Sequence, residues 1–131
     1  MIVLDASALI ELILGTPAGK SLAARIAAPE TGLHIPHLAD IEIAQVLRRY
    51  VRNKVIDPIV AATALDDLCA LDLQRHAHEP LLLRVWALRD NLSAYDAVYV
   101  ALAEVLDATL LTGDARLAAA PGVACRIEMV G

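Results

Sequence analysis

Hydrophobic positions along the chain follow two patterns. Short, nearly continuous apolar runs such as Ile2–Leu4 predict buried β-strands, and longer segments in which apolar residues recur every three or four positions predict helices. The strands are predicted at residues 2–4, 33–35, 72–74, 109–112 and 124–128. The helices are predicted at residues 6–14, 17–28, 37–52, 58–71, 79–91, 92–107 and 115–120.

This alternation of strands and helices predicts an α/β fold with a five-stranded parallel sheet. Because most of the predicted strands are nearly continuously apolar, we expect helices on both faces of the sheet, which gives three layers. The 131 residues are enough for one domain, predicted to span residues 1–131, with a core of its own. In open parallel sheets, functional sites form at the carboxyl ends of the strands.

Composition narrows the function. The chain is 58% apolar and 21% charged, which is typical of a globular protein and not of a disordered one. It has no Phe and only 3% aromatic residues, so few rings are present to stack nucleic-acid bases. The net charge of −5 argues against a broad basic surface for nucleic acid, but it allows an acidic site that meets phosphate through a metal ion.

The sequence predicts a cytoplasmic protein without a membrane segment. Asp5 and Glu11 interrupt the first apolar run, which makes that run a poor signal peptide, and no run of 18 uncharged apolar residues exists. Cys69 and Cys125 lack metal-ligand spacing. They are interpreted as buried thiols in a reducing compartment.

Asp96 is the most informative polar residue of the predicted helices. It lies four residues after Leu92 and four before Val100, inside the apolar stripe of its helix. A carboxylate on such a stripe is unfavourable unless something compensates it. One compensation is a capping box, with Ser93 as the N-cap and Asp96 reaching back to it. The other is a bound cation shared with further acids, and the two do not exclude each other.

Three further acids occupy comparable places. Asp5 closes the first predicted strand and Asp114 follows the fourth, so both belong to the carboxyl edge of the sheet, although each could simply cap the next helix. Glu42 lies on a partly apolar stripe of the third helix, where an ion pair with Arg48 or Arg49 is the simpler interpretation.

Together these acids predict a metal centre. Asp5, Glu42, Asp96 and Asp114 need a shared counter-charge if they converge. Oxygen ligands without a His or Cys partner suit a hard cation, Mg²⁺ or Mn²⁺. Such a centre favours metal-assisted phosphoryl chemistry.

Four blocks of the sequence carry a family resemblance. In order they read MIVLDASALIELIL, ADIEIAQVLRRYV, LSAYDAVYVALAE and LLTGDARL. They resemble a PIN domain of the VapC type, the toxin half of a type II toxin–antitoxin pair, over essentially the whole chain. The resemblance implies a three-layer PIN-like fold and Mg²⁺- or Mn²⁺-dependent endonucleolytic cleavage of RNA. It also implies a homodimer and a cognate VapB-type antitoxin that wraps the early helices.

The resemblance assigns roles by position. The residues that match the family's acidic quartet and the hydroxyl groups beside it are Asp5, Glu42, Asp96, Asp114, Ser7 and Thr112. Many relatives carry a further acid two residues after the position of Asp114, and this chain has Arg116 there. Arg116 is interpreted either as a contact to substrate phosphate or as a surface residue of the last helix.

Basic residues gather at the end of the third predicted helix. They are Arg48, Arg49, Arg52 and Lys54. Positive charge at a helix C-terminus is favourable by itself, and contact with RNA is the alternative interpretation.

Two other functions compete with the nuclease. A phosphohydrolase of the haloacid dehalogenase kind also begins with an Asp after the first strand. It expects a second Asp at the place of Ser7 and a later Lys, and no Lys follows Lys54. A non-catalytic PIN-like binding module would keep the fold, but it would have no need of four converging acids.

Overall fold

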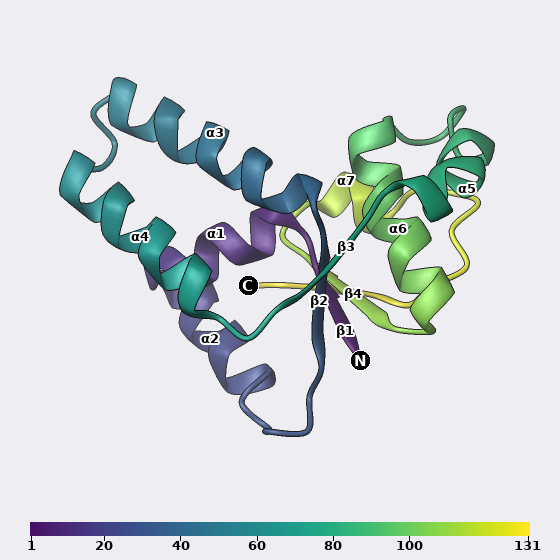
Figure 1. The fold of residues 1–131 in the computed structure, drawn as a ribbon, viewed down its shortest axis with the longest axis horizontal. Coiled ribbons are helices and arrows are strands. Elements are labelled where there is room, and N and C mark those ends of the chain that lie inside the picture. The colour runs from purple at the N-terminus through teal and green to yellow at the C-terminus, as the bar shows by residue number, and fades with distance from the viewer.

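The computed structural model describes all residues from Met1 to Gly131 (Figure 1). The strands are β1 (Ile2–Leu4), β2 (Leu33–Pro36), β3 (Gln74–His76), β4 (Thr109–Thr112) and β5 (Ile127–Met129). The helices are α1 (Ala6–Leu14), α2 (Pro17–Arg25), α3 (Leu38–Arg52), α4 (Pro58–Ala70), α5 (Leu82–Ala87), α6 (Ala94–Leu106) and α7 (Ala115–Ala118), with a 3₁₀ turn, η1, at Glu79–Leu81. No helix is long and apolar enough to cross a membrane.

The five strands form one sheet in the order β3-β2-β1-β4-β5, and every neighbouring pair is parallel. The chain starts in the middle of the sheet, winds outward through β2 to β3, and then returns to β4 on the other side of β1. The two directions of winding diverge between β1 and β4. In sheets of this kind the carboxyl ends at such a switch point form a crevice.

Helices cover both faces of the sheet. Figure 1 shows the sheet nearly edge-on, with α1 to α4 on one side and α5 to α7 on the other. Helix α6 contacts β1, β2 and β4, and α1 contacts β4 from the opposite face. Ile2, Val3 and Leu4 of the central strand β1 are buried, as expected for a strand covered by helices on both faces of the sheet. The predicted three-layer α/β fold is confirmed.

Several predicted boundaries are wrong. The third strand lies at Gln74–His76 and not at residues 72–74, because this edge strand is placed by main-chain pairing of Ile35 with Arg75, and Gln74 and Arg75 are exposed. The helix expected over residues 79–91 is a 3₁₀ turn followed by the short α5. The second helix stops at Arg25 instead of residue 28, and the last strand begins at Ile127 instead of residue 124.

The two cysteines are more accessible than predicted. Cys69 is exposed and Cys125 is only half-buried. On α4 the core-facing stripe consists of Ala61, Ala64 and Leu68, and Cys69 follows it by one residue, which turns its side chain outward. The prediction that both thiols are buried is wrong.

Helix α1 is held from both ends. Asp5 caps its start, and Gly15 ends it in the left-handed conformation, at φ 64°. Thr16 then caps α2, whose third residue, Gly19, lies against the backbone of α1. A Cβ at Gly19 would overlap the carbonyl oxygen of Glu11. Close packing of α2 on α1 therefore requires glycine at this position.

Replacement of Gly19 by alanine tests this contact. We expect Gly19→Ala to lower the free energy of unfolding by about 3 kcal/mol, because the two helices must move apart. Urea unfolding followed by circular dichroism measures the change. The exposed Ala23 of the same helix supplies the control, since Ala23→Gly should lose only about 1 kcal/mol of helix propensity. Equal effects of the two substitutions would contradict the tight packing.

Candidate active site

Asp5 lies at the carboxyl end of β1 and caps α1. Its Oδ1 accepts hydrogen bonds from the backbone N–H of Ala8 at 2.9 Å and from the Ser7 hydroxyl at 2.6 Å. Its Oδ2 accepts a short hydrogen bond from the Thr112 hydroxyl. With only 5% of its surface exposed, the carboxylate is the most buried acid of the site. The capping role and the site role that the sequence left open are both present.

Ser7 and Thr112 join the ends of β1 and β4. The Ser7 Oγ donates to Asp5 and accepts from the Gly113 N–H at 2.8 Å. The Thr112 Oγ1 likewise donates to Asp5 and accepts from the Asp114 N–H at 3.0 Å. Each hydroxyl thus has a fixed donor and acceptor direction. The two residues hold the Asp5 carboxylate against the loop that leads to Asp114.

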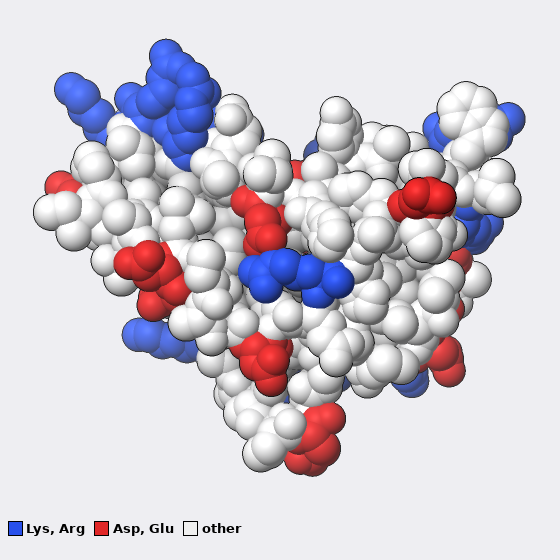
Figure 2. Space-filling model, in the orientation of Figure 1, with Lys and Arg blue, Asp and Glu red and all other residues white.

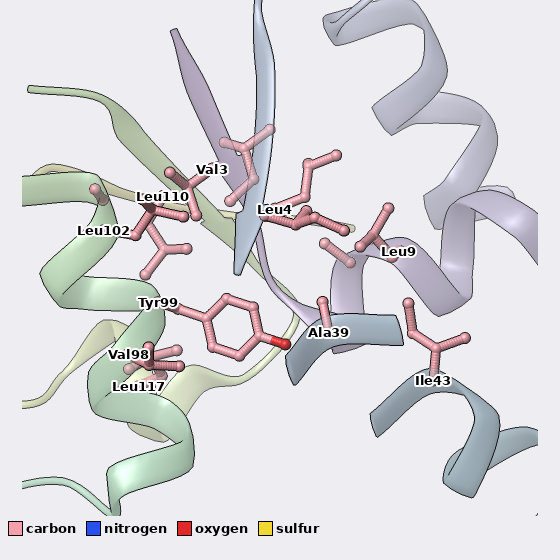
Figure 3. Packing of buried hydrophobic residues seen from close by; sticks show 14 of the residues in the cluster. Val3, Leu4, Leu9, Ala39, Ile43, Val98, Tyr99, Leu102, Leu110 and Leu117 are labelled. Atoms are coloured by element: carbon pink, nitrogen blue, oxygen red, sulfur yellow. The ribbon is translucent and has the colours of Figure 1, made fainter. Parts of the chain in front are cut away.

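Glu42 is held by a tyrosine of the facing helix. The hydroxyl of Tyr99 on α6 donates to Oε1 of Glu42 on α3 at 2.5 Å. Figure 3 shows the Tyr99 ring directed from α6 toward the start of α3, with its oxygen beside the segment that carries Ala39. The ion pair of Glu42 with Arg48 or Arg49 that the sequence suggested is absent, and this interpretation is wrong.

Sequence reasoning missed the role of Tyr99. The residue is 2% exposed, and burial together with the Glu42 carboxylate raises the pKa of its hydroxyl, which stays protonated and keeps donating. The signal was available, because a tyrosine three residues after Asp96 on an apolar stripe buries a hydroxyl that needs a partner.

Asp96 lies in the first turn of α6. The Ser93 Oγ accepts from the Asp96 N–H at 3.2 Å, which makes Ser93 the N-cap as predicted. The return hydrogen bond from the Ser93 N–H to the Asp96 carboxylate is absent, so only half of the capping box forms. The half-buried carboxylate is therefore not used up by the cap.

Asp114 and Arg116 border the exposed side of the site. Oδ1 of Asp114 accepts from the Arg116 N–H at 2.9 Å and thereby caps α7. The Arg116 Nε lies 3.7 Å from the same oxygen, and the Arg116 side chain is 94% exposed. Arg116 is a surface residue in this structure, and its guanidinium stands at the rim of the acidic site.

The four acids share one electrostatic field. Burial raises the pKa of Asp5. The hydrogen bonds from the Ser7 and Thr112 hydroxyls lower this pKa more weakly, and the charge of Asp96 adds a smaller rise. Burial also raises the pKa of Glu42, with a smaller rise from the charges of Asp96 and Asp5. For Asp96, burial and then the charge of Asp114 raise the pKa. Each predicted acid is thus near enough to at least one other for its charge to act, although no three of them converge.

The donor chemistry of the site fits a hard divalent cation. Its potential ligands are carboxylate and hydroxyl oxygens, and the only cationic side chain beside them is the exposed Arg116 at the rim, with no buried Lys or Arg. The acids surround the site without converging on one point, and no three His, Cys, Asp or Glu side chains are arranged to hold a metal. The fit lies in the type of donor and in the excess charge.

Comparison with known proteins places this chain in a family. The family model that matches residues 2–123 is the PIN domain. Ribonuclease VapC1 of Mycobacterium tuberculosis is 44% identical over 129 residues, which cover 98% of this chain and 96% of that protein. Ribonuclease VapC9 of the same organism is 42% identical over 130 residues, with 99% and 98% covered. The solved structure of VapBC2 from Rickettsia felis, bound to a DNA fragment from their promoter, aligns with a TM-score of 0.73 at 15% identity over 100% of both chains.

The chain therefore belongs to the PIN-domain family. Within that family it is one of the VapC ribonucleases, the toxin components of type II toxin–antitoxin pairs. The family resemblance seen in the sequence is confirmed. The haloacid-dehalogenase alternative is wrong, since the match over residues 2–123 is to another family.

The contact between Tyr99 and Glu42 can be tested without a metal. Removal of the hydroxyl in Tyr99→Phe should raise the pKa of Glu42, because the hydrogen bond from Tyr99 lowers it. Carboxylate chemical shifts followed by NMR through a pH titration measure this. The exposed Tyr95 of the same helix gives the matched control Tyr95→Phe, which should leave the Glu42 titration unchanged. If the pKa of Glu42 is the same in Tyr99→Phe as in the wild-type protein, the contact is contradicted.

The crowding of the acids predicts a stability gain on neutralising Asp96. Its folded-state pKa lies above the unfolded value of 3.8, so ionisation disfavours the folded chain increasingly as the pH rises between the two values. We expect Asp96→Asn to raise the free energy of unfolding of the metal-free protein at neutral pH by up to about 1 kcal/mol, allowing for solvent screening.

This gain should shrink as the pH falls toward 3.8, where the unfolded Asp96 also takes up its proton. Urea unfolding at neutral and acidic pH measures both values. The exposed Asp90 gives the control Asp90→Asn, for which we expect no comparable gain. A loss of stability in Asp96→Asn at neutral pH would show that the carboxylate is compensated in the fold.

Proposed function

We propose that the chain is a Mg²⁺- or Mn²⁺-dependent endoribonuclease that hydrolyses RNA phosphodiesters at the site of Asp5, Glu42, Asp96 and Asp114. One observation carries the proposal. Four acids from four different elements share one field at the switch point of the sheet, in a chain related to ribonucleases. A purely structural role for this region would not require such a concentration of uncompensated negative charge.

Asp5 is the proposed central ligand, because the end of β1 and two hydroxyl groups fix its direction. Asp96 and Asp114 complete the proposed ligand set, and Glu42 joins it directly or through water. When bound, Mg²⁺ or Mn²⁺ lowers the pKa of a water molecule and stabilises negative charge on phosphate oxygens. With water as the nucleophile, the products carry 5′-phosphate and 3′-hydroxyl ends.

The remaining residues have supporting roles in this proposal. Ser7 and Thr112 hold Asp5 and the loop to Asp114 in one arrangement. Tyr99 fixes the direction of Glu42. The guanidinium of Arg116 contacts a substrate phosphate in this proposal, since it is 94% exposed at the rim of the site beside Asp114.

The proposal includes the partners that the family resemblance implies. A cognate VapB-type antitoxin inhibits the nuclease by covering the early helices, and the active form is a homodimer that works on RNA in the cytoplasm. The structural neighbour from Rickettsia felis, a VapBC assembly, is consistent with an antitoxin partner.

RNA cleavage tests the proposal directly. Purified protein is incubated with a panel of structured RNAs in Mg²⁺, Mn²⁺ or EDTA, beside Asp5→Asn. We expect cuts at discrete places that need the metal, with activity at least about 100-fold lower in Asp5→Asn, since a central ligand is lost. Analysis of the product ends should give 5′-phosphates.

Two results would contradict the proposal. Ends of the 2′,3′-cyclic phosphate type would show that the RNA 2′-hydroxyl, and not water, is the nucleophile. Absence of cleavage together with absence of Mn²⁺ binding, measured by calorimetry, would favour the non-catalytic binding module.

A further inference from the structure

The outer end of α3 carries an unneutralised positive charge. Its basic residues are Arg48, Arg49, Arg52 and Lys54, all exposed, and none forms a salt bridge. Figure 2 shows blue atoms gathered over this end of the molecule, in a chain whose net charge is −5. Favourable interaction with the helix C-terminus applies to any cation in the last turn. It does not explain how the individual side chains are directed.

Consecutive residues of a helix point about 100° apart, so Arg48 and Arg49 lie on different sides of α3. Arg49 follows Glu42 by seven residues, nearly two turns, so both lie on the same side of α3, about 20° apart and about 10 Å along the axis. Arg48 lies on the other side of the buried strip that Ile43 and Leu47 form. There it lines an apolar groove between α3 and α4, together with Val51.

The side of α3 that carries Glu42 also carries Arg49, farther from the contact with α6. Near its start, α3 is joined to α6 by the contact between Glu42 and Tyr99. Beyond this contact α3 runs away from α6 (Figure 1), and the space-filling view shows a notch between the outer part of α3 and the lobe formed by α5 and α6 (Figure 2). An RNA strand bound at the acids therefore has a path away from the site along α3.

We propose that Arg49 binds a backbone phosphate of the RNA strand that flanks the cleaved bond, an inference that rests on the proposed ribonuclease activity. A guanidinium binds phosphate through two parallel hydrogen bonds, and no acid of this protein competes for Arg49. Arg49 supplies positive charge beside a site that otherwise repels RNA. Arg48, directed toward α4, does not take part.

The test compares two substitutions that remove the same charge from neighbouring positions. A fluorescent single-stranded RNA that the wild-type protein cleaves is titrated with Asp5→Asn protein, alone or combined with Arg49→Gln or Arg48→Gln, at several salt concentrations. We expect Arg49→Gln to weaken binding about five-fold and to reduce the slope of log K against log salt by about 0.7, the value for one phosphate contact on a single strand. Arg48→Gln should change both by less than half as much.

A second readout uses the otherwise wild-type enzyme. Arg49→Gln should raise KM about five-fold for a long RNA and leave kcat unchanged, because a flanking contact acts on binding. A short oligonucleotide with only the phosphates next to the cut should be cleaved equally by wild type and Arg49→Gln. Thermal unfolding of both variants verifies that they fold.

Two outcomes separate this inference from the proposed function. RNA binding and cleavage with equal effects of Arg49→Gln and Arg48→Gln would overturn the role of Arg49 and leave the nuclease in place. Absence of both RNA binding and cleavage in the wild-type protein would overturn the two together.

Discussion

The arrangement of the whole molecule depends on one buried carboxylate, that of Asp5. It stands where β1 ends and α1 begins, and hydrogen bonds from Ser7 and Thr112 tie it to the end of β4. The topology makes this possible, because β4 returns to the neighbouring place beside β1 after the chain has formed β2 and β3. An acid in this place satisfies the cap of α1, couples the two central strands and supplies charge to the crevice. The charge of Asp5 acts on the pKa of Glu42, and the charge of Asp96 acts on the pKa of Asp5.

The sequence was sufficient for the central part of the molecule. Strands β1 and β4 are apolar on both faces. Asp5 follows β1 directly and Asp114 lies two residues after β4, so both the layered fold and the carboxyl-edge site could be predicted. Asp96 and Glu42 stood out because a charge on an apolar stripe breaks the helical pattern. These signals come from charged residues at positions that the hydrophobic pattern predicts to be buried.

The sequence was insufficient where tertiary contacts decide. The exposed Gln74 and Arg75 give no apolar pattern, so β3 could be placed only by its pairing with β2. The partner of Glu42 is Tyr99, 57 residues further along the chain, whereas periodicity within one helix offered only Arg48 and Arg49. The hydrophobic pattern within one helix does not show whether a polar side chain pairs with a residue of the same helix or of a different one. The same limit applies to the shortened α5, where turns at residues 88–91 replace the expected helical end.

The four acids differ in the freedom that folding leaves them. Asp5 is fixed by three hydrogen bonds, and Glu42 and Asp96 belong to long helices on opposite sides of the sheet. Asp114 precedes a helix of only four residues: its N–H donates to Thr112, and its carboxylate is held by the cap to Arg116. In the proposed metal complex, the conformational entropy lost on binding would therefore fall mainly on Asp114 and the short α7. Among the four acids, Asp114 is therefore the one whose position can change at the lowest cost to the fold.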